Sequence, residues 1–463
     1  MLVKYEHPNH NISVMLKNKT ALWTFSAALA GFLFGFDTVV ISGANQPIKA
    51  LWNLSPLFHG TFIMSMALWG TVVGALTAGI PTERYGRKPM LLIIGLLYLI
   101  SALGSAFAPD PYSFSFFRFL GGLGVGASSV TVPAYISEIA SAKHRGRLVG
   151  RYQFNIVLGI FIAYLSNYLL DGFGGGNDWR WMLGVEAIPA LLYCALVFAL
   201  PESPRWLALK KKDVTSALRV LESVYSKELA KVELEAMVVV PQTKDKLSLF
   251  SRVFSKPLTL AFILAFFNQW SGINFILYYA PEILEISGLA GKDSLLSSIS
   301  IGGINLIFTL IGMNLIDKVG RKTLLLFGSL GYIVSLSGVA WAFKTGANPM
   351  VLLVFLCSFI ASHAIGQGAV IWVFIAEIFP TKVRALGQSF GSSVHWVFAA
   401  IITLITPYFL DSTDGVLKDT PWVIFAFFAG MMVLQLLWVL VKVPETKGVP
   451  LEKIQKQLLN TKK

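Results

Sequence analysis

The sequence predicts an all-α membrane protein whose twelve transmembrane helices form two six-helix repeats joined by a cytoplasmic helical linker. Of the 463 residues, 55% are hydrophobic and 14% are charged, whereas a soluble globular domain carries about 25% charged residues. Twelve apolar runs approach the roughly 20 residues that a helix needs to cross about 30 Å of hydrocarbon. Basic residues gather in every second loop. This composition excludes soluble and disordered proteins.

The apolar runs divide into two groups of six around one long polar stretch, which predicts the domain boundaries. The runs cover residues 21–48, 60–82, 89–109, 112–138, 152–170, 181–201, 258–281, 295–316, 323–343, 350–376, 386–410 and 421–441. We predict an N-terminal half over 1–201, amphipathic linker helices over 202–256, a C-terminal half over 257–441 and a tail over 442–463. The first run is too long for a signal peptide, so we expect it to remain as the first helix.

The net charge of +13 reports topology, because the basic residues are sorted between two sides of a membrane. All but six of the 38 Lys and Arg residues lie in the two tails or in loops that follow even-numbered helices. The exceptions are Lys49, Arg180, Lys292, Lys344 and Lys418 in the opposite loops and Arg118 within a run. The positive-inside rule therefore predicts a multi-pass cell-membrane protein with both termini in the cytoplasm. Charges spread over many short loops do not predict a nucleic-acid partner.

Two cysteines, Cys194 and Cys357, lie in separate apolar runs, away from any cluster with metal-ligand spacing. We expect unpaired thiols that face lipid or the core, and we predict neither a metal site nor a cofactor.

Three short motifs recur in the same order in both halves at nearly one spacing. Glu83–Lys88 returns as Asp317–Lys322, Tyr135–Arg145 as Phe374–Arg384, and Pro201–Ser203 as Pro444–Thr446. Three ordered recurrences predict a duplicated six-helix unit. Transporters built from two parallel repeats have this arrangement and bind their substrate near the membrane midplane.

Further motifs accompany the duplication. They are Phe34–Asp37, Arg118–Gly126, Pro201–Leu207, Gln269–Asn274, Tyr278–Tyr279, Asn305, Glu377–Arg384 and Pro444–Gly448. Together they resemble the sugar porter family of the major facilitator superfamily, close to bacterial proton-coupled pentose and hexose symporters and to glucose facilitators. The resemblance covers essentially all twelve runs. It implies the major facilitator fold and alternating access. One chain would contain a complete site, so no protein partner is required.

A sugar site needs amides, which both donate and accept hydrogen bonds, and an aromatic surface for the apolar C–H faces. Several carboxamides and tryptophans stand in apolar runs, where an unpaired amide is costly. The resemblance implies sugar contacts at Gln153, Asn268, Gln269, Asn274, Asn305, Trp372, His395 and Trp396. Alternatively, these side chains bond or pack against neighbouring helices. Asn268, Ile160 and His395 depart from common family patterns, so the preferred sugar is not predicted.

Glycines predict interruptions of two helices. Gly272 weakens the seventh helix near the middle of the membrane, where a break exposes backbone groups to substrate. Gly366 and Gly368 favour a similar break in the tenth helix, but Ala369 replaces the proline usual in the resembling family, which puts that break in doubt. The alternative role of each glycine is close helix packing.

Asp37, Arg118 and Glu186 are the charged side chains deep within the runs. Asp37 lies about 24 Å along its helix, which leaves about 6 Å to the outer face, and the other two lie about 8 to 9 Å below that face. We therefore expect them to meet in the outer third. An acid that shares an arginine with a second acid changes its proton affinity when helices shift, as a coupling site requires. The alternatives are a static ion pair or an Arg118 that reaches outward.

Acids and bases at the cytoplasmic helix ends of both halves form a candidate gate. They are Arg84, Arg87, Glu138, Arg145, Glu202, Arg205, Arg321, Glu377 and Arg384. We predict that ion pairs among them, namely Glu138 with Arg145, Glu377 with Arg384 and Glu202 with Arg205, join the halves in the outward-open state and separate when the protein opens inward. Alternatively, the basic residues only set the topology. The resemblance also implies a gating role for Tyr278 and Tyr279.

These observations favour a proton-coupled monosaccharide symporter, with a pentose or hexose, a proton and the lipid bilayer as its partners. The rival is a facilitative uniporter with the same fold, in which Asp37 is structural. A transport-incompetent sugar sensor typically needs a long signalling tail, whereas about 20 residues follow the last run. An enzyme is disfavoured, because the sequence shows no nucleophile–base pair, metal-ligand set or phosphate loop.

Overall fold

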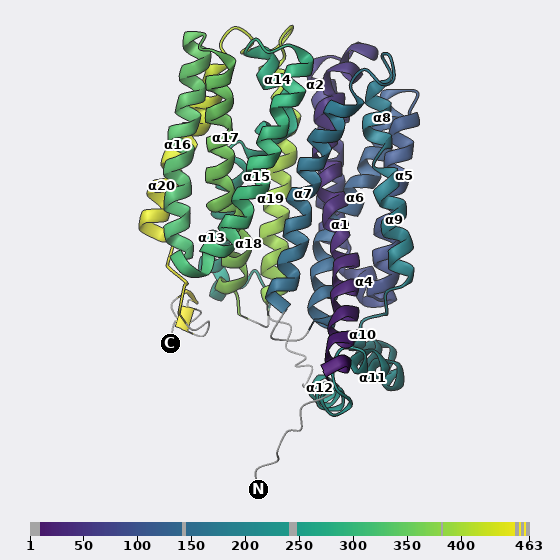
Figure 1. Cartoon of the computed structure of the whole chain (residues 1–463). Helices are drawn as coiled ribbons and strands as arrows, with labels where there is room; N and C mark the ends of the chain where they lie inside the picture. Colours follow the sequence, from purple (N-terminus) through teal and green to yellow (C-terminus); the bar gives the residue numbers. More distant parts are fainter. Residues whose placement is uncertain are drawn as a thin grey trace.

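The computed structural model describes residues 10–140, 145–239, 248–380, 383–449, 453–454 and 458–459. This part of the chain forms a bundle of helices that run along a common direction, without a strand (Figure 1). Twelve helical segments are long and apolar enough to cross a membrane, and each overlaps one predicted run. The predicted all-α architecture is therefore confirmed.

The N-terminal half starts with α1 (His10–Leu51). It continues with α2 (Pro56–Phe58), the π-helix η1 (His59–Met64), α3 (Met66–Thr77), α4 (Gly79–Tyr85), α5 (Arg87–Phe107), α6 (Pro111–Ile139), α7 (Arg145–Leu170), α8 (Asp178–Gly184) and α9 (Ala187–Phe198). Local signals define these boundaries. Before α6, for example, the Asp110 carboxylate accepts the backbone N–H groups of Tyr112 and Ser113 at 2.9 and 3.1 Å, and Pro111 follows as the first helical residue.

The linker forms a small helical unit. Its elements are α10 (Pro204–Trp206), the π-helix η2 (Leu207–Lys211), α11 (Val214–Glu222) and α12 (Lys227–Val239). Leu207, Leu221 and Leu234 are buried in its own core, as amphipathic helices require. These helices, the start of α1 and the end of α20 lie at one end of the bundle (Figure 1). We call it the linker end and the opposite one the far end.

The C-terminal half repeats the six-span pattern. It comprises the 3₁₀-helix η3 (Arg252–Phe254), α13 (Ser255–Gln269), α14 (Ile273–Ile286), α15 (Gly291–Val319), α16 (Arg321–Thr345), α17 (Pro349–Ile365), α18 (Gln367–Ile378), α19 (Arg384–Leu410) and α20 (Trp422–Lys442). The seventh span joins α13 to α14, and the tenth joins α17 to α18.

Both breaks occur at glycines. Gly272 has a φ of +87°, a conformation that side-chain-bearing residues rarely adopt, and it separates α13 from α14 as predicted. Gly366 separates α17 from α18, so the doubt raised by Ala369 was misplaced. There the backbones of Gly366 and Gly328 pack so closely that a Cβ on Gly366 would lie 2.8 Å from the Gly328 Cα. The α17–α18 break therefore lacks a proline but coincides with a close approach of α16.

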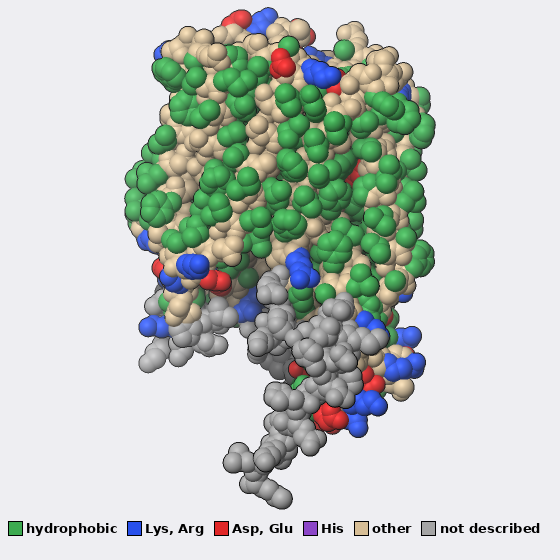
Figure 2. Space-filling model, viewed as in Figure 1, with side chains coloured by type: hydrophobic (Ala, Val, Ile, Leu, Met, Phe, Trp, Pro, Cys, Tyr) green, Lys and Arg blue, Asp and Glu red, His purple; other side chains and the backbone are tan. Residues whose placement is uncertain are grey.

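The surface matches a membrane environment. Hydrophobic side chains cover the sides of the bundle, whereas charged side chains gather toward its two ends (Figure 2). Both cysteines are unpaired, with Cys194 buried and Cys357 half-buried, as expected from the sequence.

Candidate functional site

Five of the predicted substrate contacts form one cluster between α13, α18 and α19. The Gln269 amide nitrogen lies 3.1 Å from both ring nitrogens of His395 and 3.1 Å from Asn268 Oδ1. The His395 ring lies 5.2 Å from the Trp372 ring and 4.8 Å from the Trp396 ring, centroid to centroid. Amides and aromatic rings thus lie side by side next to the α13–α14 break.

Two buried amide atoms at this break have no hydrogen-bond partner among the described residues. They are Gln269 Oε1 and Asn274 Nδ2. Gln269 is fully buried and Asn274 is 9% exposed. A buried amide atom left unpaired costs free energy, so both atoms are available to a ligand with hydroxyl groups.

Two further predicted contacts lie on other helices. Gln153 is half-buried in α7. Asn305 of α15 accepts a hydrogen bond from Thr309 at 3.4 Å. In the described parts of the chain, no hydrogen bond joins Gln153, Asn274 or Asn305 to the His395 cluster. The cluster nevertheless reaches the N-terminal half, because the Trp396 ring lies 5.6 Å from Phe34 of α1.

Asp37 of α1 and Arg118 of α6 form a buried ion pair. Arg118 Nη1 lies 2.5 Å from Asp37 Oδ1, and Nη2 donates to the Asp37 backbone carbonyl at 2.9 Å. Their side chains are 1% and 2% exposed. Glu186, directly before α9, is 1% exposed and adjoins Asp37. The structure therefore brings the three membrane charges together, as their depths indicated.

The charges in this triad do not balance if both acids are ionised. Two carboxylates beside one guanidinium leave one negative charge in a site closed to water, which is expensive. Asp37 Oδ2 and Glu186 Oε1 also lack a partner within the described residues. One proton held by the two carboxyl groups would remove the excess charge and supply a hydrogen-bond donor. The geometry suits reversible binding of a proton.

At the linker end, Arg87 joins three parts of the N-terminal half. Its Nη2 lies 2.5 Å from Glu83 and 2.9 Å from Glu138, and Glu138 also accepts a hydrogen bond from Ser203 at 2.5 Å. Glu202 accepts the Arg87 backbone N–H at 2.9 Å and so caps the start of α5. Burial, the largest effect, raises the pKa of Glu202.

The C-terminal half contains the same arrangement. Arg321 Nη2 lies 2.8 Å from Glu377, which also accepts a hydrogen bond from Thr446 at 2.6 Å. Glu445 accepts the Arg321 backbone N–H at 2.9 Å and caps α16. Burial opposes ionisation of Glu445, but hydrogen bonds from backbone N–H groups outweigh it and lower its pKa. The predicted duplication therefore extends to individual contacts.

Some predicted partners differ from the observed ones. Glu202 caps a helix instead of pairing with Arg205, which is exposed, because the chain after α9 folds back onto the start of α5. Arg384 Nε donates to the Phe379 carbonyl at 3.4 Å. Arg84 is exposed and lies over the ring of Tyr85.

The side chain of Arg145 lies outside the described residues. Among those described, no ion pair at the linker end joins the two halves. A network between the halves in another conformation stays a prediction.

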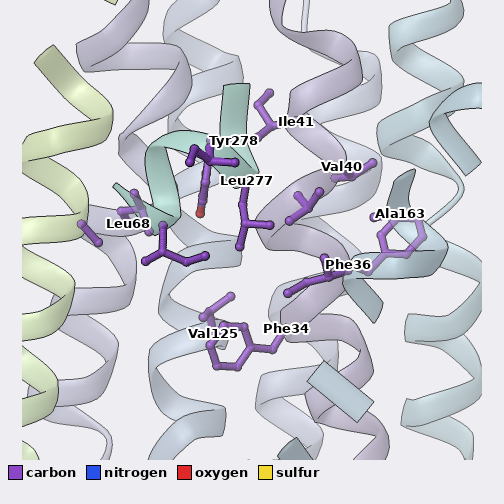
Figure 3. Close-up of a cluster of buried hydrophobic side chains, with 14 of the residues drawn as sticks. Phe34, Phe36, Val40, Ile41, Leu68, Val125, Ala163, Leu277 and Tyr278 are labelled. Atoms are coloured by element: carbon purple, nitrogen blue, oxygen red, sulfur yellow. The ribbon is translucent and has the colours of Figure 1, made fainter. Parts of the chain in front are cut away.

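The predicted gating tyrosines lie on α14. Tyr278 is 1% exposed and lies against Thr38 of α1, at the contact between the halves. Figure 3 shows Tyr278 and Leu277 of the C-terminal half close to apolar side chains of the N-terminal half. Tyr279 donates to the Thr403 carbonyl of α19 at 2.8 Å, within its own half. The contact between halves is reinforced by Tyr164 of α7, which donates to the Leu277 carbonyl at 2.6 Å.

The far end contains a polar cluster that the sequence did not predict. Lys49 of α1 pairs with Asp411, which follows α19, and Asn45 of α1 donates to Glu282 of α14 at 2.6 Å. His59 of η1 bonds to Asn45. We call these five residues the far-end latch, because two of their contacts join the halves.

The sequence did not predict the far-end latch, because hydropathy places its ionisable residues just outside the apolar runs. Lys49, His59, Glu282 and Asp411 each stand one residue beyond a predicted run. The helices that carry Lys49, His59 and Glu282 continue past those limits, and Asp411 directly follows α19. All four residues are buried or nearly buried. A search for ionisable residues, histidine included, at the first position outside each run would have found these four.

Asp411 stays ionised over the whole physiological pH range. Burial alone would raise its pKa, but hydrogen bonds from Lys49, Thr413 and the Asp414 backbone hold the pKa at about 2. Since this value lies below the ordinary 3.8, the carboxylate contributes stability above about pH 4 that is lost only as the pH falls through about 2.

Asp411→Asn should therefore lower the melting temperature of the purified protein at both pH 5 and pH 8. The substitution leaves Lys49 without its anionic partner, and breaking a buried pair costs about 3 to 5 kcal/mol. The exposed neighbour Asp414 provides the control, since Asp414→Asn should have little effect. A destabilisation seen at pH 8 but not at pH 5 would contradict this assignment.

The chain is similar to known transporters over nearly its whole length. The family model described as "Sugar (and other) transporter" matches residues 23–458. The arabinose-proton symporter of Bacillus subtilis (strain 168) is 35% identical over 441 residues, which cover 93% of each chain. The D-xylose-proton symporter of Escherichia coli (strain K12) is 32% identical over 474 residues, which cover 93% of this chain and 94% of that one.

Solved structures agree with these similarities. The inward open conformation of the xylose transporter XylE from E. coli matches with a TM-score of 0.82 at 31% identity, covering 94% of this chain and 99% of that chain. XylE bound to 6-bromo-6-deoxy-D-glucose matches with a TM-score of 0.78 at 31% identity, covering 96% and 99% of the two chains.

Proposed function

Since the chain belongs to the sugar transporter family of the major facilitator superfamily, we propose that it carries a monosaccharide together with a proton across the cell membrane by alternating access. The family and the relatives are transporters, and the relatives named for arabinose, xylose and glucose support a pentose or hexose as substrate.

The observation that carries proton coupling is the buried triad of Asp37, Arg118 and Glu186. One guanidinium shared by two carboxylates makes the site take up or release a proton when the helices around it move. A uniporter has no need of a proton-binding group and would keep the same residues as a static ion pair.

The contacts between the halves support an inward-facing conformation. The far-end latch and the Tyr164–Leu277 hydrogen bond close the far end, whereas the Arg87 and Arg321 networks remain within their own halves. The similarity to inward open XylE agrees with this assignment. The linker end is then cytoplasmic, as the distribution of basic residues predicts.

The sugar site proposed here lies at the α13–α14 break. Gln269 and Asn274 would bond sugar hydroxyl groups through their unpartnered atoms. Trp372 and Trp396, whose rings both lie close to His395, offer aromatic surfaces for the C–H faces. Gln153 would contribute from the opposite half.

Uptake of radiolabelled D-xylose, arabinose and D-glucose into proteoliposomes tests the proposal. A symporter accumulates its sugar when the outside is more acidic and stops at equilibrium when the pH gradient is removed. A uniporter equilibrates sugar in both conditions, and a sensor does neither. Uptake that ignores the gradient would overturn proton coupling and leave the uniporter.

Asn274→Ala should weaken sugar binding by about 1 to 3 kcal/mol, which corresponds to roughly 5- to 150-fold in affinity, because a sugar hydroxyl loses its partner. Asn314→Ala is the matched control. Asn314 is an exposed amide on α15 whose side chain donates to the Leu310 carbonyl of its own helix at 2.8 Å. Binding is measured by calorimetry on purified protein. Wild-type affinity in Asn274→Ala would remove Asn274 from the site.

A cysteine placed at Thr215 should resist membrane-impermeant maleimide in intact cells, because the linker helices are proposed to be cytoplasmic. Thr215 is exposed on α11, so burial would not protect it. The background is the chain with Cys194 and Cys357 replaced, and permeabilised cells show that the new thiol reacts. Rapid labelling of intact cells would reverse the orientation.

A further inference from the structure

The proposed symport requires that a proton leave the triad toward the cytoplasm in the inward-facing conformation. Yet the Asp37, Arg118 and Glu186 side chains are at most 2% exposed in that conformation. The triad is closed to bulk water, so a proton must travel through the protein. The inference below rests on proton coupling and concerns the groups that conduct the proton.

A chain of buried hydroxyl groups crosses the N-terminal half through three helices. The Tyr98 hydroxyl of α5 lies 3.4 Å from Ser128 Oγ of α6, and Ser128 Oγ lies 3.0 Å from the Tyr152 hydroxyl of α7. Tyr98 and Ser128 are 0% exposed and Tyr152 is 6% exposed. Either atom of each contact can be the donor. Ser128 Oγ also donates to the Val125 carbonyl at 2.9 Å, so its hydroxyl group must rotate before it passes a proton to Tyr152.

The upper end of the chain approaches the triad through Ser101. Ser101 lies one helical turn beyond Tyr98 on α5, on the same face. Its Oγ is buried and has no partner in the described part of the chain. Ser101 Oγ and Asp37 Oδ1 border the same face of Gly121 on α6. Tyr98 also interacts electrostatically with both Asp37 and Glu186.

The chain descends toward the linker end. At 1.5 Å per residue, Ser101 lies about 21 Å and Tyr98 about 16 Å along α5 from Arg87, whereas Tyr152 lies about 10 Å along α7 from Arg145. Tyr152 precedes Gln153, which is half-buried. The hydroxyl groups thus span the distance from the sealed acids to the cytoplasmic half of the protein.

We propose that Ser101, Tyr98, Ser128 and Tyr152 form a relay that conducts the proton from the Asp37–Glu186 pair to the cytoplasm. Ser101 Oγ bonds to neither Asp37 nor Tyr98 in the described part of the structure, so it must first move within reach of each. The carboxyl group then gives its proton to Ser101 Oγ, Ser101 passes its own proton to Tyr98, Tyr98 to Ser128, and Ser128 to Tyr152. Tyr152 releases one proton to water. Each hydroxyl gains one proton and loses one, so the only net change is the loss of one proton from the acids.

The alternative is that these hydroxyl groups only hold α5, α6 and α7 together. Two assays distinguish the roles. Sugar-driven proton influx requires the carrier to release its proton inside, whereas counterflow exchanges labelled for unlabelled sugar while the proton stays bound. Loss of a relay slows the first and spares the second, but loss of packing impairs both.

The experiment uses the full-length protein in proteoliposomes loaded with a pH-sensitive dye, with whichever of D-xylose, arabinose and D-glucose the wild type accumulates. In Tyr98→Phe, sugar-driven proton influx should fall about tenfold or more, while counterflow stays at the wild-type rate. Ser128→Ala removes the central hydroxyl group with a smaller change in side-chain volume, and it should have the same effects on the two fluxes. It therefore keeps the test decisive if Tyr98→Phe is poorly folded.

Tyr135→Phe is the matched control. Tyr135 is another buried tyrosine of the same half, and its hydroxyl donates to the Pro201 carbonyl at 2.8 Å, apart from the relay. Both fluxes should be unchanged in this variant. Wild-type proton influx in Tyr98→Phe and Ser128→Ala, or equal loss of both fluxes, would overturn the relay alone. A wild-type protein without sugar-driven proton influx would overturn symport and the relay together.

Discussion

Asp37→Asn should abolish concentrative sugar uptake while sugar exchange continues. The amide has nearly the shape of the carboxyl group but cannot release a proton, so a pH gradient no longer drives accumulation. Arg118 keeps the Glu186 carboxyl group as a neighbour, which limits the cost of the lost ion pair. In proteoliposomes with an acidic exterior, the internal sugar concentration should rise only to the external one, whereas counterflow per molecule of protein should persist.

Asp293→Asn is the control for this experiment. Asp293 is exposed in the first turn of α15, so removing its charge should leave accumulation intact. The amount of each protein in the vesicles is quantified first, because a folding defect would also lower uptake. If Asp37→Asn accumulates sugar as the wild type does, Asp37 is not the coupling group and the static ion pair becomes the better interpretation.

Gly35→Val should prevent stable assembly of the N-terminal half. Helices α1 and α7 pack so closely at Gly35 that any Cβ there would overlap the backbone carbonyl of Ile156. Backbone cannot give way as a side-chain tip can, so the helices must separate. Overpacking lowers the free energy of unfolding by about 1 to 3 kcal/mol and occasionally more. We expect a loss at the upper end of this range, because the added side chain overlaps with backbone atoms. Separation would also move Asp37, two residues further along α1.

The control for this change is Gly430→Val on α20, where no atom lies within 4 Å of an added Cβ. Size-exclusion profiles and melting temperatures of the detergent-purified proteins make the comparison. Gly430→Val should elute as a single species near the wild-type melting temperature, whereas Gly35→Val should aggregate or melt much earlier. Equal behaviour of the two variants would show that α1 and α7 tolerate separation.

The sequence predicted the spans because crossing a membrane depends on local length and hydropathy. The same holds for the α13–α14 break, since a glycine with positive φ is a property of one residue. Asp37, Arg118 and Glu186 were also predicted to meet, because their depths follow from helix rise alone.

Contacts between distant segments were harder to predict. Glu138 contacts Arg87, and Glu377 contacts Arg321. In each pair the two residues lie on different helices, so the spacing of residues along one helix does not predict the contact. The break at Gly366 depends on the approach of Gly328 from α16, a tertiary contact. The cluster of Gln269 with His395 likewise required the fold, although each residue had been singled out.

The contacts made by the segment that follows the last helix of each half have a consequence for synthesis of the chain. The segment after the sixth helix, with Glu202 and Ser203, binds the region around Arg87, and Glu445 and Thr446 repeat this in the second half. Each contact joins the last part of a half to an earlier helix of that half, so it forms only after translation of the whole half. The first half can then close on the ribosome before the second emerges. A nascent chain arrested before Glu202 should remain sensitive to protease, whereas one arrested within the C-terminal half should already protect its first six spans.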